Sequence, residues 1–161
     1  MTVYTTMASP VGELLLVGEI RDGAVMLTAV SMAGNKSVLV RPEWTADGDA
    51  FAAIIPQLSA YFAGERTGFD IPVGESGTEF QRRVWRALEE IPYGSTTTYG
   101  EIARRIGAPK AAVRAVGSAI GANPLLIVRP CHRVIGADGS LTGYAGGVER
   151  KQRLLELERV A

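Results

Sequence analysis

The strongest sequence constraint on the fold of this chain is its content of one cysteine and one histidine, which are adjacent at Cys131-His132. A single cysteine excludes an internal disulfide, and one cysteine with one histidine cannot supply a zinc site of cysteine and histidine ligands. The fold must therefore rest on a hydrophobic core, and 161 residues of which 47% are hydrophobic are enough to form one. We expect no metal site.

The chain has no membrane-spanning pattern. No segment approaches the roughly 20 consecutive apolar residues that cross a bilayer. Residues 1–6 lack the basic and apolar stretches of a secretory signal. We therefore expect no membrane association and a cytoplasmic location.

A net charge of zero conceals a difference between the two halves of the chain. Residues 1–75 contain four Lys/Arg and nine Asp/Glu, a balance of −5, whereas residues 76–161 contain 13 and eight, a balance of +5. A basic half suggests an anionic partner, with nucleic acid as the first candidate. An unevenly charged, solvated surface would give the same counts.

The N-terminal half has the pattern of strands followed by a helix. Residues 11–17 and 24–30 are short apolar runs, and the hairpin-like residues 21–23 lie between them. Residues 50–63 carry large apolar side chains at helical spacing, although Pro56 is unfavourable inside a helix. The pattern predicts a small antiparallel sheet with one helix.

A linker is predicted at residues 70–77, which are rich in glycine and polar residues. It would divide the chain into two domains, residues 1–74 and 75–161.

The C-terminal half is predicted to be mostly helical. Capping-box signatures open two helices, one from Thr78 to Leu88 and a shorter one from Thr98 to Ile106. A turn at residues 107–109 leads into a third helix over residues 110–120. Two helices joined by a tight turn that contains glycine resemble a helix-turn-helix.

The third helix combines small side chains with one long cation, Arg114. Small residues let a helix backbone approach another surface closely, and Arg114 would then reach beyond that surface. A tightly packed internal helix with Arg114 at the surface is the alternative. Because this half of the chain is basic, we favour contact with DNA.

A reactive cysteine is predicted from the residues around Cys131. The strand-like run at residues 125–128 is ended by Pro130, which places Cys131 at a turn. Arg129, His132 and Arg133 would make a positive environment that lowers the pKa of a thiol and favours the thiolate nucleophile. The alternative is an inert buried cysteine beside a structural histidine.

The segment Pro130-Cys131-His132-Arg133-Val134 resembles the active-site signature of the O6-alkylguanine-DNA alkyltransferases. The other motifs that match this family, in order along the chain, are Ile91-Pro92-Tyr93-Gly94, Thr98-Tyr99-Gly100-Glu101, Arg114-Ala115-Val116-Gly117, Asn123-Pro124, Gly143-Tyr144-Ala145-Gly146-Gly147 and Leu154-Leu155-Glu156-Leu157-Glu158. The resemblance is strong over residues 77–161 and weaker over the N-terminal half.

The resemblance implies an α/β (α+β) protein whose N-terminal domain is ribonuclease-H-like. It also implies a single-turnover DNA repair reaction, in which Cys131 irreversibly accepts the alkyl group of O6-alkylguanine, with O4-alkylthymine as an open second substrate. His132 would relay the thiol proton through a water, and Glu158 would orient His132. Asn123 would stabilise the hinge, and no cofactor would be needed.

The resemblance further implies that the protein, as a monomer, extrudes the damaged base from double-stranded DNA. Arg114 would fill the vacated space, and the Tyr99 hydroxyl would lie near N3 of the base, with backbone N–H groups near Cys131 and Ala145 around O6. The predicted DNA-binding residues are Arg114, Tyr99, Ala115, Gly117 and Arg133. The predicted substrate pocket consists of Tyr99, Val128, Tyr144 and Ala145.

Two departures from the family pattern affect these assignments. The segment from Gly107 to Arg114 is one residue longer than usual, and Arg129 stands where an aliphatic residue is typical. Arg129 would either point to solvent or perturb Cys131. Three rival functions stay open: a cysteine hydrolase, a damage-binding protein without chemistry, and a helix-turn-helix regulator.

Overall fold

A computed structural model describes residues 1–33 and 40–159 of the chain. It divides into two compact units, Met1–Glu75 and Ser76–Ala161. Among the described residues, every helix is too short or too polar to cross a lipid bilayer.

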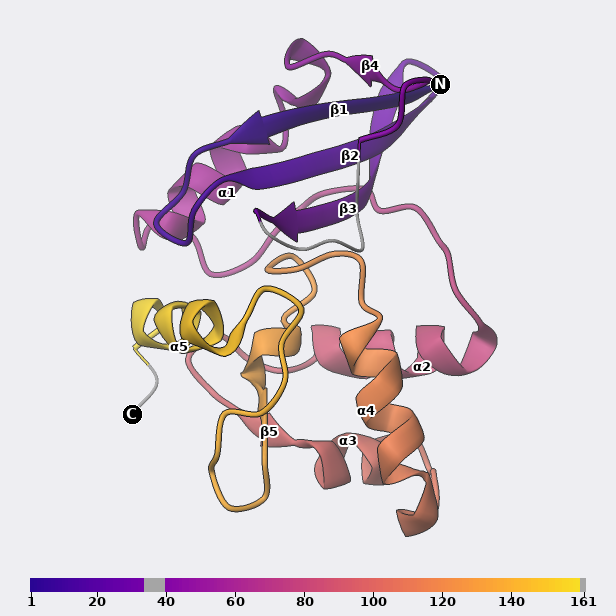
Figure 1. Cartoon of the computed structure of the whole chain (residues 1–161), viewed down its shortest axis with the longest axis vertical. Helices are drawn as coiled ribbons and strands as arrows, with labels where there is room; N and C mark the ends of the chain where they lie inside the picture. Colours follow the sequence, from indigo (N-terminus) through magenta and orange to yellow (C-terminus); the bar gives the residue numbers. More distant parts are fainter. Residues whose placement is uncertain (34–39, 160–161) are drawn as a thin grey trace. The chain divides into compact units, whose positions relative to one another are not determined.

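The first unit is built on a four-stranded sheet with the order β3-β2-β1-β4 (Figure 1). The strands are β1 (Thr2–Met7), β2 (Leu14–Arg21), β3 (Ala24–Met32) and β4 (Thr45–Ala46). β1 and β3 are antiparallel to β2, whereas β4 is parallel to β1. The predicted antiparallel sheet is therefore confirmed, with β1 as a strand that the apolar pattern did not reveal.

The hairpin between β2 and β3 follows from two residues, Asp22 and Gly23. Both have positive φ, 52° and 78°, and Arg21 pairs with Ala24 across the turn. A two-residue turn with two positive φ angles matches the twist of the strands that it joins. The hairpin predicted at residues 21–23 is confirmed.

The helix predicted over residues 50–63 is shorter than expected. The structure has a 3-10 turn, η1 (Asp49–Phe51), followed by α1 (Ile55–Phe62), with Pro56 in the first turn of α1. Proline is tolerated there because the first N–H groups of a helix have no partner within the helix. Pro56 therefore lies in the first turn of this helix and does not interrupt it.

The segment predicted as a linker contributes to the first unit. The Leu27 N–H donates to the Pro72 carbonyl at 2.9 Å, and the Gly74 N–H donates to the Leu27 carbonyl at 2.9 Å. Val73 thereby forms a parallel bridge with Leu27 of β3. Residues 72–74 are consequently part of the sheet's edge, and only the residues after them connect the units.

The second unit is mostly helical, as predicted. Its elements are α2 (Glu79–Glu89), β5 (Thr97–Thr98), α3 (Tyr99–Arg105), η2 (Lys110–Ala112), α4 (Val113–Gly121), η3 (Cys131–Arg133), β6 (Val134–Ile135) and α5 (Val148–Leu157). β5 and β6 form a short parallel pair. The third predicted helix is therefore divided into a 3-10 turn and α4.

Side-chain caps determine where α2 and α3 begin. Thr78 and Gln81 exchange the two hydrogen bonds of a capping box, as predicted. At α3, the Thr98 hydroxyl accepts from the Glu101 N–H at 3.1 Å. The Glu101 carboxylate pairs instead with Arg104 at 2.5 Å, so the second predicted capping box is only half formed.

α2 and α4 pack together through a buried tryptophan. Trp85 of α2 is 4% exposed, and its indole N–H donates to the Ala119 carbonyl of α4 at 2.8 Å. This bond satisfies the one polar atom that burial of an indole would otherwise leave unpaired.

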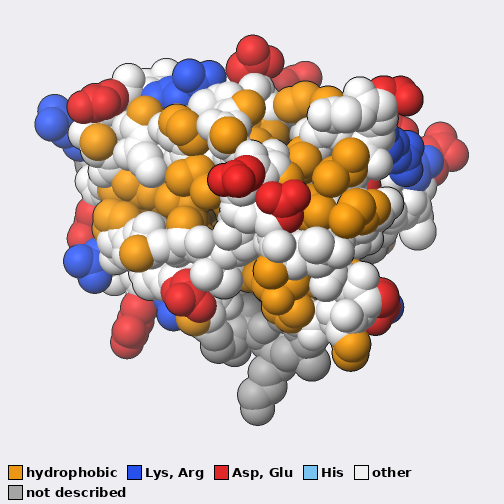
Figure 2. All heavy atoms as spheres, turned by 90° about the horizontal axis from the view of Figure 1, so that it is seen from above, with side chains coloured by type: hydrophobic (Ala, Val, Ile, Leu, Met, Phe, Trp, Pro, Cys, Tyr) orange, Lys and Arg blue, Asp and Glu red, His pale blue; other side chains and the backbone are white. Residues whose placement is uncertain are grey.

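The surface carries no single charged patch in the view of Figure 2. Acidic and basic side chains are scattered over this face, between groups of hydrophobic side chains.

Candidate active site

Cys131 follows two tight turns of the backbone. The Val128 N–H donates to the Leu126 carbonyl at 2.8 Å around Ile127, whose φ is 72°. The Cys131 N–H donates to the Arg129 carbonyl at 2.7 Å around Pro130, whose φ and ψ are −78° and 61°. These are γ-turns, and the one at Ile127 is the rare form with positive φ. The strand predicted at residues 125–128 is therefore wrong.

The Asn123 side chain holds these turns in place. Its Oδ1 accepts from the Leu125 N–H at 3.0 Å, and its Nδ2 donates to the carbonyls of Leu125 and Arg129 at 3.3 and 3.0 Å. Asn123 is 5% exposed, so these bonds replace the water that a buried amide has lost. They are side-chain-to-backbone bonds of the kind predicted for this residue.

Arg129 points inward, not to solvent. Its side chain is 9% exposed, and Nε lies 3.3 Å from a carboxylate oxygen of Glu89. Its guanidinium carbon lies 4.9 Å from the centre of the Trp85 ring, and Nη1 donates to Asn123 Oδ1 at 3.4 Å. The cation therefore packs against α2 and the Asn123 side chain that supports the turn before Cys131.

Burial dominates the ionisation of the Cys131 thiol. Cys131 is 5% exposed, and this desolvation raises the pKa of its thiol to about 11. The Asn123 side chain and the nearby Lys151 and Arg129 cations act in the opposite direction, with smaller effects. The lowered thiol pKa predicted from neighbouring charges is therefore wrong for the protein without DNA, because the sequence pattern did not include the cost of burial.

The raised pKa predicts an unusual pH profile for alkylation of Cys131 by iodoacetamide. A shift from 9.0 to about 11 leaves about 100-fold less thiolate at pH 8 than an ordinary thiol has. The rate measured by intact mass spectrometry should rise about tenfold per pH unit through pH 10. In guanidinium the same rate should level off near pH 9, and a plateau below pH 8 in the folded protein would contradict the raised pKa of Cys131.

The same shift contributes to folding stability. Because the folded-state pKa lies above the unfolded-state value, the thiol stabilises the folded protein below about pH 9. This contribution is lost as the pH rises toward about 11.

A buried network lies next to the cysteine in the chain. His132 Nε2 lies 2.7 Å from Glu158 Oε2, and both side chains are fully buried. Arg133 donates to the same carboxylate from Nε at 2.8 Å and from Nη2 at 3.0 Å. Burial also lowers the pKa of His132, although Glu158 opposes this shift. The imidazole is therefore held neutral and able to accept a proton.

The carboxylate determines which imidazole nitrogen is the base. Since an ionised carboxylate can only accept, the hydrogen of neutral His132 lies on Nε2 and points to Glu158. His132 Nδ1 is buried, and it has no hydrogen-bond partner among residues 1–33 and 40–159. Nδ1 is therefore the atom of this network that can take a proton.

Arg133 serves this network and not a DNA surface. It is 6% exposed, and besides Glu158 it donates from Nη1 to the Ile91 carbonyl at 2.7 Å. A guanidinium committed to these acceptors is unavailable to phosphates, contrary to the DNA contact predicted for it.

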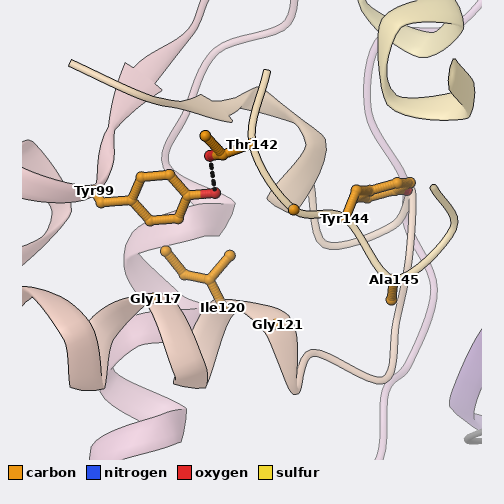
Figure 3. Close-up of a pocket in the computed structure, with 8 residues that line it drawn as sticks. Tyr99, Gly117, Ile120, Gly121, Thr142, Tyr144 and Ala145 are labelled. Carbon is orange, nitrogen blue, oxygen red and sulfur yellow. Dashed lines mark hydrogen bonds between the residues drawn. The ribbon is translucent and has the colours of Figure 1, made fainter. Parts of the chain in front are cut away.

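A cavity of about 430 Å³ lies between α3, α4 and the loop before α5. Figure 3 shows the Tyr99 ring on one side of it, Tyr144 and Ala145 on another, and α4 below. The residues that line it are Tyr99, Gly117, Ile120, Gly121, Thr142, Gly143, Tyr144 and Ala145. Predicted pocket residues Tyr99, Tyr144 and Ala145 are thus brought together, whereas Val128 and Cys131 are not among the lining residues.

With the exception of Arg133, which belongs to η3, the residues predicted to contact DNA lie on the two helices α3 and α4. Tyr99 begins α3, whereas Arg114, Ala115 and Gly117 belong to α4. Arg114 and Ala115 are exposed, and a Cβ on Gly117 would meet Tyr99 Cδ1 at 3.8 Å. α4 therefore carries small residues and one exposed cation, and the same helix forms one wall of the cavity.

Two residues near the cavity were missed by the sequence reasoning. Lys151 is 1% exposed, and its Nζ donates to the Thr142 carbonyl at 2.8 Å. The Thr142 hydroxyl donates to the Tyr99 hydroxyl at 3.0 Å. Lys151, Leu154, Leu155 and Glu158 recur at helical spacing and are all buried, so this periodicity could have identified Lys151.

Comparisons with known proteins assign both units. Residues 79–160 match the family model described as 6-O-methylguanine DNA methyltransferase, DNA binding domain. Residues 2–74 match the ribonuclease-like domain of the same methyltransferase. The chain belongs to the 6-O-methylguanine DNA methyltransferase family. The family, the fold class and the enzyme class predicted from the motifs are confirmed.

Individual relatives match over almost their full length. The methylated-DNA–protein-cysteine methyltransferase of Mycolicibacterium paratuberculosis is 58% identical, with 99% of this chain and 93% of the relative covered. The enzyme of the same name from Methanosarcina acetivorans is 50% identical, with coverages of 96% and 97%. The crystal structure of Mycobacterium tuberculosis OGT in complex with DNA is 53% identical, with coverages of 98% and 92% and a TM-score of 0.88.

Proposed function

We propose that this protein repairs DNA directly, by moving the alkyl group of O6-alkylguanine in duplex DNA onto Cys131. The observation that carries this proposal is the buried network of His132, Glu158 and Arg133, which adjoins the single cysteine. Family membership supports the reaction class, and the DNA-binding description of residues 79–160 supports DNA as the partner. The monomeric state and the cytoplasmic location stay predictions.

The proposed reaction begins with removal of the thiol proton. His132 Nδ1 accepts the proton through a bridging water, and the resulting imidazolium is stabilised by Glu158, 2.7 Å from Nε2. Because the pKa of the thiol is about 11 before DNA binds, thiolate formation depends on this base at neutral pH. The relay thus supplies a nucleophile that burial otherwise keeps protonated.

The alkyl transfer itself is a single displacement. The Cys131 sulfur forms a bond to the alkyl carbon, the bond between that carbon and O6 breaks, and its electron pair goes to O6. The guanine leaves as an anion with charge on O6 and the ring nitrogens, and a proton restores the neutral base. Sulfur supplies the nucleophile and the proton comes from the thiol, so the transfer requires neither a cofactor nor a metal.

Groups around the cavity would stabilise the departing guanine. The Tyr99 hydroxyl donates to N3, and the Ala145 backbone N–H lies near O6. The Cys131 N–H is already bonded to Arg129 at 2.7 Å, so we do not assign it to O6. The product thioether has no leaving group, and each protein molecule therefore acts once.

The direct test is mass spectrometry of the protein after mixing with duplex DNA that contains O6-methylguanine. We expect one added methyl group per protein, located on the peptide that contains Cys131. Unmodified duplex serves as the control. A reduced, folded protein that gains no methyl group would overturn the proposed function, and turnover of an ester or peptide would favour a cysteine hydrolase.

Replacement of Arg114 with alanine tests the extrusion of the damaged base. Arg114 is exposed on α4, where it can fill the space that the base leaves. We expect transfer from duplex DNA to slow by about tenfold or more, because an unpaired, unstacked base costs a few kcal/mol. Reaction with free O6-benzylguanine, which needs no extrusion, should change less than about twofold.

Arg153→Ala is the matched control, because Arg153 is an exposed cation on α5. It tests whether loss of any positive charge weakens the reaction with DNA. Equal losses on both substrates for Arg114→Ala, or equal losses for the two variants on duplex DNA, would contradict the role assigned to Arg114.

A further inference from the structure

The Tyr99 hydroxyl is hydrogen-bonded to Thr142, another residue that lines the cavity. The Thr142 hydroxyl donates to the Tyr99 hydroxyl oxygen at 3.0 Å, and Figure 3 shows this bond at the rim of the cavity. The two residues are 43 positions apart in the sequence, on α3 and on the loop before α5. The contact therefore links two sides of the cavity.

Either hydroxyl of this pair can donate, and donation by Thr142 is the arrangement that leaves the hydrogen of Tyr99 free for a bound base. A phenol has one hydrogen, which lies close to the ring plane on one side or the other of the C–O bond. When the oxygen accepts from Thr142 on one side, the hydrogen is directed to the other side. A guanine bound in the cavity lined by Tyr99 and Ile120 would present its ring nitrogen as the acceptor for this hydrogen.

Thr142 is itself fixed by the interior of the unit. Its carbonyl accepts from Lys151 Nζ at 2.8 Å, and Lys151 is 1% exposed on α5. A buried ammonium has lost its hydrogen bonds to water, so breaking its hydrogen bond to the Thr142 carbonyl would be unfavourable. Gly117 of α4 lies beside the Tyr99 ring, because a Cβ at that position would meet Cδ1 at 3.8 Å, an ordinary van der Waals distance.

We propose that Thr142 is a positioning residue for alkyl transfer, because it holds the Tyr99 hydroxyl with its hydrogen directed at the ring nitrogen of the bound guanine. This inference rests on the proposed function and adds to it a residue that acts through Tyr99. Thr142 forms no bond to the reacting atoms. Its effect is on the transition state, in which negative charge develops on the guanine, and not on the capture of DNA.

The test compares Thr142→Val with Thr142→Ser. Valine keeps the shape of threonine and removes the donor, whereas serine keeps the donor. At saturating O6-methylguanine duplex, the single-turnover rate should fall about fivefold to tenfold for Thr142→Val and stay within about twofold for Thr142→Ser. The dissociation constant for the duplex should change less than about twofold in both. Thr96→Val, a threonine outside this cavity, is the matched control.

A double-mutant cycle with Tyr99→Phe distinguishes positioning from a general loss of structure. If Thr142 acts through the Tyr99 hydroxyl, Thr142→Val should slow transfer by less than about twofold once that hydroxyl is absent. An equal loss in both backgrounds, an unchanged rate for Thr142→Val, or a slow Thr142→Ser variant would overturn the inference. Methyl transfer by the unaltered protein in the same assay separates these outcomes from failure of the proposed function.

Discussion

Replacing Cys131 with alanine is expected to abolish methyl transfer and to leave binding of O6-methylguanine duplex within about twofold of the unaltered protein. In the proposed reaction, the Cys131 sulfur is the atom that bonds to the methyl carbon. Because the thiol is protonated at neutral pH, its removal takes no charge from the buried network of His132 and Glu158. The free energy of unfolding should change by about 1 kcal/mol.

The measurement combines a gel-shift titration with intact mass spectrometry after incubation with lesion-containing duplex. Cys131→Ser is the companion variant, since it keeps a side chain of similar size and offers only a weak oxygen nucleophile. Neither variant should gain a methyl group. Transfer by the alanine variant would show that another residue accepts the alkyl group.

Replacing Glu158 with glutamine is expected to slow methyl transfer by about 100-fold, the scale of general acid–base catalysis. Glutamine carries no charge, so it stabilises neither the His132 imidazolium nor the Arg133 cation. Arg133 is 6% exposed, and a buried cation without its carboxylate destabilises a protein by about 3 kcal/mol. We therefore expect a loss of both rate and stability.

Single-turnover kinetics and urea unfolding measure the two effects separately, provided that the rate is taken at a temperature where the variant is folded. Glu101→Gln is the stability control, because it removes a carboxylate from a pair with Arg104 at the surface. Because both groups of that pair are in contact with solvent, its loss should leave the free energy of unfolding nearly unchanged. A folded Glu158→Gln variant that transfers methyl groups at the normal rate would rule out the proposed proton relay.

The local features of this fold could be predicted wherever a few neighbouring residues determine them. Asp22-Gly23 can adopt two positive φ angles, and the hairpin follows. Thr78 and Gln81 satisfy each other's backbone groups, and α2 begins there. In both places the residues that determine the structure lie within four positions of one another, so no tertiary contact is needed to form it.

The features that could not be predicted depend on contacts between distant residues. The apolar run at residues 125–128 looks like a strand, but it forms turns, and Asn123 binds the backbone on either side of them at Leu125 and Arg129. Arg133 looked like a cation for DNA, but it meets Glu158, 25 residues away, in the interior. Neighbouring charges predicted a thiolate at Cys131, whereas burial outweighs them.

The buried, protonated state of Cys131 also bears on how long an unused molecule keeps its function. Peroxide and disulfide reagents attack the thiolate, and their rates follow thiolate content and exposure. Oxidation of Cys131 to sulfinic acid would inactivate the molecule permanently, because each molecule has one reactive thiol and that oxidation is not readily reversed. With 5% exposure and a pKa of about 11, Cys131 is shielded from such oxidants until DNA binding brings its alkylated base. The burial of Cys131 makes a general base necessary for alkyl transfer. The same burial therefore also protects the one thiol with which each molecule can react.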